Sequence, residues 1–365
     1  MSHLSNPHSR LGTIHSWKRQ TVWFLLFLSL ACAFHTCATA QERFSLMEYN
    51  VENLFDCRHD SLKEDTEFLP GAARKWTYRR YRQKLTNIAK VIAAVGESQL
   101  PDLVALCEVE NDHVMRDLTR YSSLKHAGYR YVMTESPDRR GIDVALLYQP
   151  ATFRLITHRS VRIPLKYKDQ KPTRDILHVV GRVMTGDTLD VFVCHFPSRS
   201  GGKRRTEPFR ICAATVLRAQ IDSLVRVRQV PRIVVTGDFN DTPESKTLRE
   251  VMGAYAPVEK VEAKRLYNLL ADRTDEGSYY YQGEWEIIDQ LMVTGALLDP
   301  CAPFHTSQGQ ARILKLPFLL TDDARYGGKI PLRTYYGARY QGGYSDHLPL
   351  LLQFDLKLIT GQIDP

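Results

Sequence analysis

The chain has 365 residues, of which 43% are hydrophobic and 25% are charged, an ordinary composition for a globular protein. The sequence contains no internal repeat or low-complexity segment, which excludes repeat and fibrous architectures. Its 49 Lys and Arg residues outnumber its 41 Asp and Glu residues, a mildly basic balance that is compatible with a polyanionic substrate without identifying one.

Residues 1–40 have the pattern of a secretory leader. A basic segment ends at Arg19, residues 21–34 are apolar, and residues 38–40 supply small side chains at the spacing of a cleavage site. The apolar run is short for a bilayer-spanning helix. We therefore expect cleavage near Ala40, a secreted or periplasmic protein and no membrane contact of the mature chain. The alternative is a protein that stays anchored at the membrane by a lipid or by this segment.

Residues 41–365 are predicted to form a single domain. They retain five widely spaced cysteines, and this odd number argues against a disulfide framework or a zinc site. The five are Cys57, Cys107, Cys194, Cys212 and Cys301.

The first half of this region alternates between strand and helix patterns. Strands are recognised by period-two alternation or by short apolar runs, and helices by apolar residues at three-to-four spacing. We expect strands at 44–50, 103–108, 129–134 and 142–148, a helix at 76–95 and a short helix at 112–124.

The second half continues the pattern and ends in a mixed region. We expect a flexible basic loop at 200–205, and residues 301–344 carry no clear strand pattern. Predicted strands cover 176–183, 189–195, 233–236, 279–285, 287–293 and 348–354, and a long helix covers 208–227, with a short helix after Pro243.

The stretch from Gly237 to Asn240 follows a buried strand and is the most informative in the chain. Gly237 allows a backbone turn. If the strand alternation persists, the side chains of Asp238 and Asn240 point to the same face, where a carboxylate and an amide would suit a water or a phosphate oxygen. The ordinary alternative is an Asx turn that closes the strand.

Polar side chains recur at the ends of apolar runs. Each one alone is explained by a turn or by a structural role, but together they predict one site at the tips of several strands. They are Asn50, Glu108, His195, Asp238, Asn240 and Asp346.

Seven short motifs, in this order, resemble the endonuclease/exonuclease/phosphatase superfamily, which includes pancreatic deoxyribonuclease and the abasic-site endonucleases. The resemblance extends from about residue 44 to 356 and implies an α/β fold of the α+β type. That fold is a four-layer sandwich of two packed, mostly antiparallel mixed sheets flanked by helices. The motifs are Tyr49-Asn50-Val51-Glu52, Leu106-Cys107-Glu108, Gly141-Ile142-Asp143-Val144-Ala145, Cys194-His195-Phe196-Pro197, Gly237-Asp238-Phe239-Asn240, Ile288-Asp289 and Ser345-Asp346-His347.

The resemblance also implies a divalent-metal site and a set of catalytic residues. Glu108 is expected on the metal, with Asn50, Glu52 and Asp346 beside it. The oxygen ligands suit Mg²⁺ or Mn²⁺, with Ca²⁺ as a structural alternative. The expected catalytic residues are His195, Asp238, Asn240, Asp289 and His347, and the expected substrate-binding residues are Arg174, Asn50 and Asn240.

These roles predict metal-assisted attack of water on a phosphodiester. Asp238 would take the proton from water, and Asp289 would hold His347 as an imidazolium facing the phosphate. The expected activity is that of a secreted nuclease acting on DNA or RNA, without a stable protein partner. Basic segments at 139–140 and 203–205 are candidate phosphate contacts. The alternatives are a phosphatase or a sphingomyelinase-like lipid phosphodiesterase on the same scaffold, and a catalytically inactive binding protein.

Overall fold

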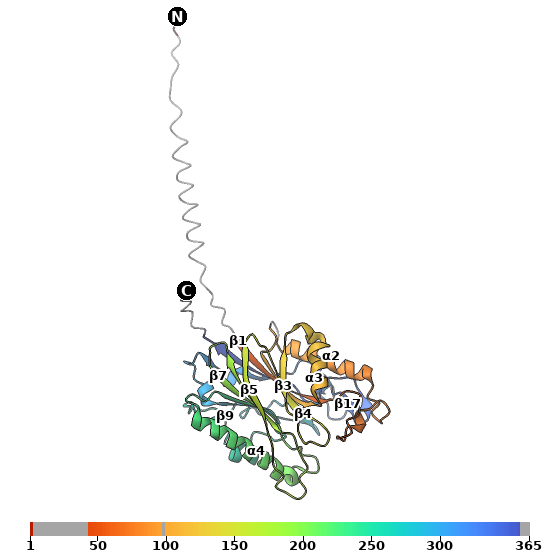
Figure 1. The fold of residues 1–365 in the computed structure, drawn as a ribbon. Helices are drawn as coiled ribbons and strands as arrows, with labels where there is room; N and C mark the ends of the chain where they lie inside the picture. Colours follow the sequence, from red (N-terminus) through yellow and green to blue (C-terminus); the bar gives the residue numbers. More distant parts are fainter. Residues whose placement is uncertain (3–42, 97–98, 358–365) are drawn as a thin grey trace. The chain divides into compact units, whose positions relative to one another are not determined.

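A computed structural model describes residues 1–2, 43–96 and 99–357 (Figure 1). Residues 3–40 of the predicted leader, with its apolar run and cleavage site, lie outside the described residues. Within the described ranges, no helix is both long and apolar enough to cross a membrane.

The first large sheet has seven strands, and its centre is a parallel pair. β1 and β2 run parallel, and helix α2 (Tyr78–Val95) connects them. The neighbouring strands are antiparallel, so the sheet is mixed. The order is β13 (Phe304–His305), β19 (Leu350–Leu356), β1 (Arg43–Leu54), β2 (Leu103–Val109), β4 (Asp143–Tyr148) and β3 (Arg130–Met133), with β14 (Ala311–Ile313) also on β19.

The second large sheet has six strands and repeats this plan. β7 and β8 form its parallel pair, and helix α4 (Lys203–Val227) connects them. The order is β5 (Phe153–Val161), β6 (Ile176–Val183), β7 (Thr188–His195), β8 (Ile233–Asp238), β12 (Asp289–Thr294) and β9 (Leu266–Asn268).

The two sheets pack face to face and the helices lie outside them. β1 contacts β8, β2 contacts β7, and β12 contacts β19. α2 and α3 (Asp112–Arg120) lie on the outer side of the first sheet, and α4 lies on the second (Figure 1). Burial of one apolar stripe per helix against a sheet is the main stabilising term in such layers. The predicted sandwich of two mixed sheets flanked by helices is confirmed.

Short elements complete the fold. They are η1 (Thr66–Phe68), η2 (Ser123–His126), the π-helix η3 (Thr247–Val251), β10 (Tyr279–Tyr281), β11 (Glu284–Glu286), η4 (Gly295–Leu297), η5 (Gln308–Gln310), η6 (Pro317–Leu319), β15 (Leu320–Asp322), β16 (Lys329–Pro331), β17 (Tyr335–Tyr336) and β18 (Arg339–Tyr340). The five described cysteines are free, as the sequence predicted.

The structure differs from the predicted elements in three places. The expected strand at 279–285 is the hairpin of β10 and β11, because Gln282 and Gly283 adopt φ of 50° and 95° and reverse the chain. Edge strand β5 was not predicted, since its mostly exposed side chains give no clear alternation.

The third difference concerns the expected basic loop at 200–205. α4 begins at Lys203, so the basic residues form the first turn of the helix. Buried Arg210 bonds the Thr206 hydroxyl at 2.8 Å and the Lys203 carbonyl at 3.0 Å. These bonds stabilise the first turn, although Pro208 removes one backbone donor from the helix.

Candidate active site

The carboxyl ends of the two parallel pairs meet at one edge of the sandwich. Asn50 lies near the end of β1 and Glu108 near the end of β2, while His195 and Asp238 are the last residues of β7 and β8. Parallel neighbours end at the same edge of a sheet. Packing of β1 and β2 against β8 then brings the two edges together.

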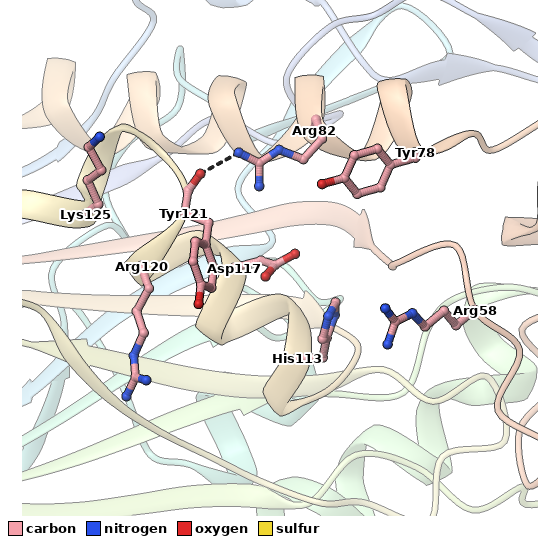
Figure 2. A pocket seen from close by; sticks show the side chains of 8 residues that line it. All are labelled: Arg58, Tyr78, Arg82, His113, Asp117, Arg120, Tyr121 and Lys125. Atoms are coloured by element: carbon pink, nitrogen blue, oxygen red, sulfur yellow. Dashed lines mark hydrogen bonds between the residues drawn. The ribbon is translucent and has the colours of Figure 1, made fainter.

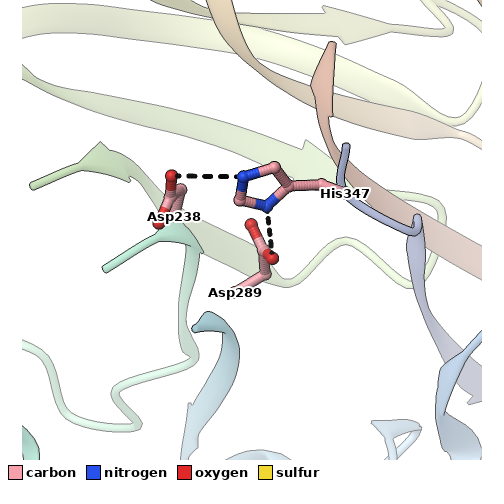
Figure 3. A group of neighbouring side chains, drawn as sticks. All are labelled: Asp238, Asp289 and His347. Carbon is pink, nitrogen blue, oxygen red and sulfur yellow. Dashed lines mark hydrogen bonds and ion pairs between the residues drawn. The ribbon is translucent and has the colours of Figure 1, made fainter. Parts of the chain in front are cut away.

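His347 lies between two aspartates of this edge (Figure 3). Asp289, the first residue of β12, pairs in register with Asp238 of β8. The Nδ1 atom of His347 is 2.8 Å from Oδ2 of Asp289, and its Nε2 is 3.9 Å from Oδ2 of Asp238. Burial alone would lower the pKa of His347, but the Asp289 carboxylate, followed by Asp238 and Asp346, raises it well above the ordinary value. His347 is therefore an imidazolium at neutral pH.

The Ser345 hydroxyl fixes the segment that carries His347. It donates to the Asn50 carbonyl at 2.7 Å and accepts the backbone N–H of His347 at 3.1 Å. The loop before β19 is thereby tied to the end of β1. The Tyr279 ring completes this side of the site, 4.9 Å from the imidazole between ring centroids.

His195 has the opposite charge state. Its Nε2 lies 3.5 Å from Oδ2 of Asp238 and 3.8 Å from Oε1 of Glu108, distances at which an ion pair would form if the imidazole were charged. Burial, and then the positive charges of Arg174 and Arg140, lower the pKa of His195 well below its ordinary value. His195 is therefore neutral, and the two histidines of the site serve different roles.

Asp238 uses its two oxygens for different purposes. Oδ1 accepts the backbone N–H of Asn240 at 2.8 Å, and Oδ2 accepts the Asn50 side-chain amide at 3.1 Å. Burial, partly offset by His347, raises the pKa of Asp238 to about 7. A carboxylate with a pKa near the working pH suits a general base.

The backbone after Asp238 does not continue the strand. Asn240 has φ of 50°, and its side-chain amide donates to the Phe196 carbonyl at 3.1 Å. The expected strand alternation therefore fails, and the Asx turn forms instead; it still leaves Asp238 Oδ2 directed into the site. Gly237 is needed for close packing, because a Cβ there would lie 1.9 Å from the Cys194 carbonyl oxygen.

Glu108 and Asn50 form the first half of the predicted metal set. Oε2 of Glu108 accepts the Asn53 backbone N–H at 2.9 Å, and Oε1 lies 3.5 Å from the Asn50 amide nitrogen. Glu108 has φ of 66° where the β1–β2 and β2–β4 registers shift. Such strain is expected where the surroundings hold a side chain in a functional position.

Arg333 holds the second half of that set. It lies 3.2 Å from Oε1 of Glu52 and 2.6 Å from Oδ2 of Asp346. The Thr334 backbone N–H donates to the other Glu52 oxygen at 2.6 Å. The structure thus divides the four expected metal residues into Glu108 with Asn50, and an arginine-paired Glu52 with Asp346. The sequence analysis missed Arg333, which lies in the region without a strand pattern.

A second set of donor atoms also lies within metal-binding distance. Ligand atoms of Asp238, Asp289 and His347 lie within 4.8 Å of one another. The Asp289–His347 hydrogen bond already engages one atom of each of these two residues. Glu108 has its carboxylate partly exposed, with neutral hydrogen-bond donors around it. This oxygen-rich environment fits a hard cation such as Mg²⁺ better.

Arg174 and Glu48 lie behind the site. Arg174 is buried, donates to the Phe196 carbonyl at 2.5 Å and lies 3.3 Å from an Asp138 oxygen, so it supports the His195 side of the site from inside. Glu48 was not predicted as a site residue. It is fully buried with Oε2 unpartnered among the described residues, and burial followed by the Asp289 charge raises its pKa well above the ordinary value.

Comparisons with known proteins agree with this geometry. The sequence model described as "Endonuclease/Exonuclease/phosphatase family" matches residues 45–356. Protein angel of Drosophila melanogaster is 22% identical over 272 residues, covering 71% of this chain and 68% of that protein.

Solved structures share the fold at low sequence identity. Humanized TDP2 of D. rerio superposes with a TM-score of 0.54 at 13% identity, covering 86% of this chain and 99% of that chain. A second TDP2 structure, from D. rerio and complexed with a single-strand DNA product, superposes with a TM-score of 0.52 at 13% identity. The match covers 86% of this chain and 99% of that chain. A mannosyl-6-phosphatase of Bacteroides thetaiotaomicron superposes with a TM-score of 0.53 at 15% identity, covering 86% of this chain and 100% of that chain.

Proposed function

The chain belongs to the endonuclease/exonuclease/phosphatase family and is a phosphoester hydrolase, and from this premise we propose that it is a secreted, divalent-metal-dependent nuclease. The observation that carries the proposal is the juxtaposition of Asp238, whose pKa is near 7, with the imidazolium of His347. A base and a cationic donor side by side are what hydrolysis of an anionic diester requires.

Glu108 is the residue that would hold the metal, with Asn50 beside it. The bound cation would supply Lewis-acid stabilisation of the charge on the phosphate oxygens. The paired Glu52 and Asp346 stand next to this position, where Arg333 balances their negative charge. The family's metal requirement and the oxygen-rich environment of Glu108 support this assignment, with Mg²⁺ or Mn²⁺ as the ion.

The side chains of the site divide the remaining work. Asp238 accepts the proton of the attacking water, and the Asx turn of Asn240 keeps its other oxygen occupied. His347, held by Asp289, donates a charge-assisted hydrogen bond to the phosphate. His195 faces Asp238 with Nε2 and, being neutral, adds no second positive charge to the site, while Arg174 bonds the neighbouring Phe196 carbonyl.

Nucleic acid is the proposed substrate and the exterior of the cell the proposed location. Residues 41–365 hold 46 Lys and Arg residues against 41 Asp and Glu residues, and this mildly basic balance is compatible with a polyanion. The structure of D. rerio TDP2 complexed with a single-strand DNA product has the same fold and supports nucleic acid as the substrate class. The leader pattern of residues 1–40 supports secretion.

A substrate panel tests the proposal. The full chain is expressed in a secreting host, and the mature N-terminus is read by mass spectrometry. Hydrolysis of plasmid DNA, RNA, bis-p-nitrophenyl phosphate, a sugar monophosphate and sphingomyelin is then measured with Mg²⁺, with Mn²⁺ and with a chelator. We expect metal-dependent cleavage of DNA or RNA and a start near residue 41. Turnover of the sugar phosphate alone would indicate a phosphatase, and turnover of sphingomyelin alone would indicate a lipid phosphodiesterase. Absence of turnover on every substrate would indicate a binding protein.

A further inference from the structure

A second concave site lies outside the catalytic edge, between α2, α3 and the loop after β1 (Figure 2). Its volume is about 530 Å³. Tyr78 and Arg82 come from α2, and Arg120, Tyr121 and Lys125 come from the end of α3 and the segment that follows it. We refer to it as the basic pocket.

The charge of this pocket is unbalanced. Four cations line it, Arg58, Arg82, Arg120 and Lys125, against one acid, Asp117. The side chains of Arg58, Arg120 and Lys125 form no hydrogen bond or ion pair with the part of the chain that the structure describes. Scattered surface cations are ordinary, but cations around one hollow repel one another within a Debye length. A bound anion relieves that repulsion.

The one acid offsets only one of the four positive charges. Asp117 Oδ2 accepts the Tyr81 hydroxyl at 2.9 Å. The Arg82 guanidinium in turn donates to the Tyr121 backbone carbonyl, which joins the two helical walls of the pocket (Figure 2). The walls are therefore held by bonds that do not use the side chains of Arg58, Arg120 and Lys125, although the charge of Arg120 also acts on Asp112.

Two exposed aromatic rings lie among these cations. Tyr78 is 64% exposed and Tyr121 is 58% exposed, although each ring is largely apolar. A small inorganic anion needs no aromatic surface. Cations combined with accessible rings are what binds a single nucleic-acid strand, because the cations contact phosphates and the rings stack on bases of any sequence.

Short links connect the pocket to the catalytic edge. The Asn53 backbone bonds Glu108 of the active site, and three residues later the Asp56 backbone bonds Glu110 at 2.7 Å. Asp56 Oδ2 lies 3.2 Å from Nδ1 of His113, which lines the pocket. The loop after β1 thus runs from the metal-binding position to the wall of the pocket.

We propose that the basic pocket is an accessory site for a single-stranded nucleic acid, contacting phosphates and bases of the substrate beyond the scissile bond. This proposal rests on the proposed nuclease function. It adds that the substrate is a single strand long enough to extend from the active site over α2 and α3.

Binding is tested without cleavage. Anisotropy of a labelled oligodeoxythymidylate of roughly 12 nucleotides is measured in chelator at several salt concentrations. Arg120→Glu with Lys125→Glu is compared with a control of equal charge change, Arg226→Glu with Lys264→Glu, which replaces two exposed cations elsewhere. We expect the pocket variant to raise Kd on the order of tenfold or more and to reduce the salt slope. We expect the control to change Kd by less than about twofold.

The rings are tested separately. Tyr78→Ala with Tyr121→Ala should weaken binding on the order of tenfold, whereas the Phe variants should keep wild-type affinity, since the stacking face remains. Every pocket variant should hydrolyse bis-p-nitrophenyl phosphate at the wild-type rate, with KM raised only for oligonucleotides.

Each contrary result has its own meaning. Equal oligonucleotide affinity in pocket and control variants overturns the accessory site and leaves the nuclease intact. If the pocket variants lose affinity for inorganic phosphate but keep wild-type affinity for the oligonucleotide, the pocket is a small-anion site, and the proposal is also overturned. A wild-type protein that neither binds nor cleaves oligonucleotides removes the nuclease function itself.

Discussion

His347 presents Nδ1 to Oδ2 of Asp289 at 2.8 Å, and this contact sets the charge of the imidazole. The two residues are 58 positions apart in the chain and meet because β12 and the segment before β19 reach the same edge. Burial opposes the charged form of His347, and Asp289 is the largest of the three carboxylates that favour it, ahead of Asp238 and Asp346.

Asp289→Asn should therefore lower kcat and move the alkaline limit of activity. Loss of the carboxylate lets burial lower the pKa of His347, so the imidazolium is lost at a lower pH. We expect kcat to fall on the order of 10²-fold at neutral pH and the basic limb of the pH–rate profile to shift to lower pH. Hydrolysis of bis-p-nitrophenyl phosphate from acid to alkaline pH measures both. An unchanged basic limb, with a folded protein by circular dichroism, would separate Asp289 from the reacting histidine.

Asp238→Asn should instead remove the acidic limb of the pH–rate profile. Burial raises the pKa of Asp238 to about 7, so the base is protonated and inactive below that pH and gains activity as pH rises through it. The amide cannot take a proton, and we expect a loss of 10²- to 10⁴-fold in kcat, roughly the range for general acid–base catalysis. The remaining rate should lack the inflection near neutral pH. Wild-type-like activity in this variant would assign the base to another residue.

Arg333→Ala should change the response to metal. Removing the guanidinium takes away one of the two cations that act on the carboxylates of Glu52 and Asp346, the other being buried Lys84, and this loss destabilises the metal-free protein. A divalent ion can then replace the lost charge, so the rise in Tm on adding Mn²⁺ should exceed that of the wild type. Differential scanning fluorimetry with chelator and with Mn²⁺ measures this difference. Arg333→Lys is the control, since it keeps a positive charge without the planar fork. An equal rise in Tm on adding Mn²⁺ in the wild type and both variants would contradict the view that a divalent ion replaces the charge of Arg333.

Glu110→Gln should change how stability depends on pH. Burial, followed by the charges of Asp56, Asp65 and Asp60, raises the pKa of Glu110 to about 8, although the Asp56 backbone bond opposes the shift. The folded state therefore favours the protonated form, and this stabilisation, full below the ordinary carboxyl pKa, is lost as pH rises through about 8.

Glutamine retains the hydrogen-bond acceptor but cannot ionise. We expect the Tm of Glu110→Gln to match the wild type near pH 5 and to exceed it near pH 9, with a free-energy difference on the order of a few kcal/mol. Exposed Glu135→Gln is the matched control and should show no such crossover. Parallel Tm curves for Glu110→Gln and wild type would contradict the raised pKa.

Local sequence patterns were sufficient for most of the regular structure. Alternating residues and apolar runs indicate which side of a strand is buried. Such patterns can be recognised from residues that are close together in the chain. The same patterns placed Asn50, Glu108, His195 and Asp238 at strand ends, since a polar residue after an apolar run marks emergence from the core. The hairpin at Gln282-Gly283 was missed although a glycine there offered a turn signal.

Other properties of the site depend on contacts between distant segments. Arg333 meets Glu52 across 281 positions, and no local pattern marks that pairing. His195 and His347 are the same residue type at similar strand ends, yet one is neutral and the other charged, because burial and the adjacent charges differ. The left-handed backbone of Glu108 depends on a shift in strand register. Sequence by itself determined most of the long central strands and the polar groups that terminate them, but not edge strand β5 or the short strands of residues 301–344. Only the tertiary structure decided which of those polar groups meet and with what charge, because electrostatic energies depend on distance and burial in three dimensions.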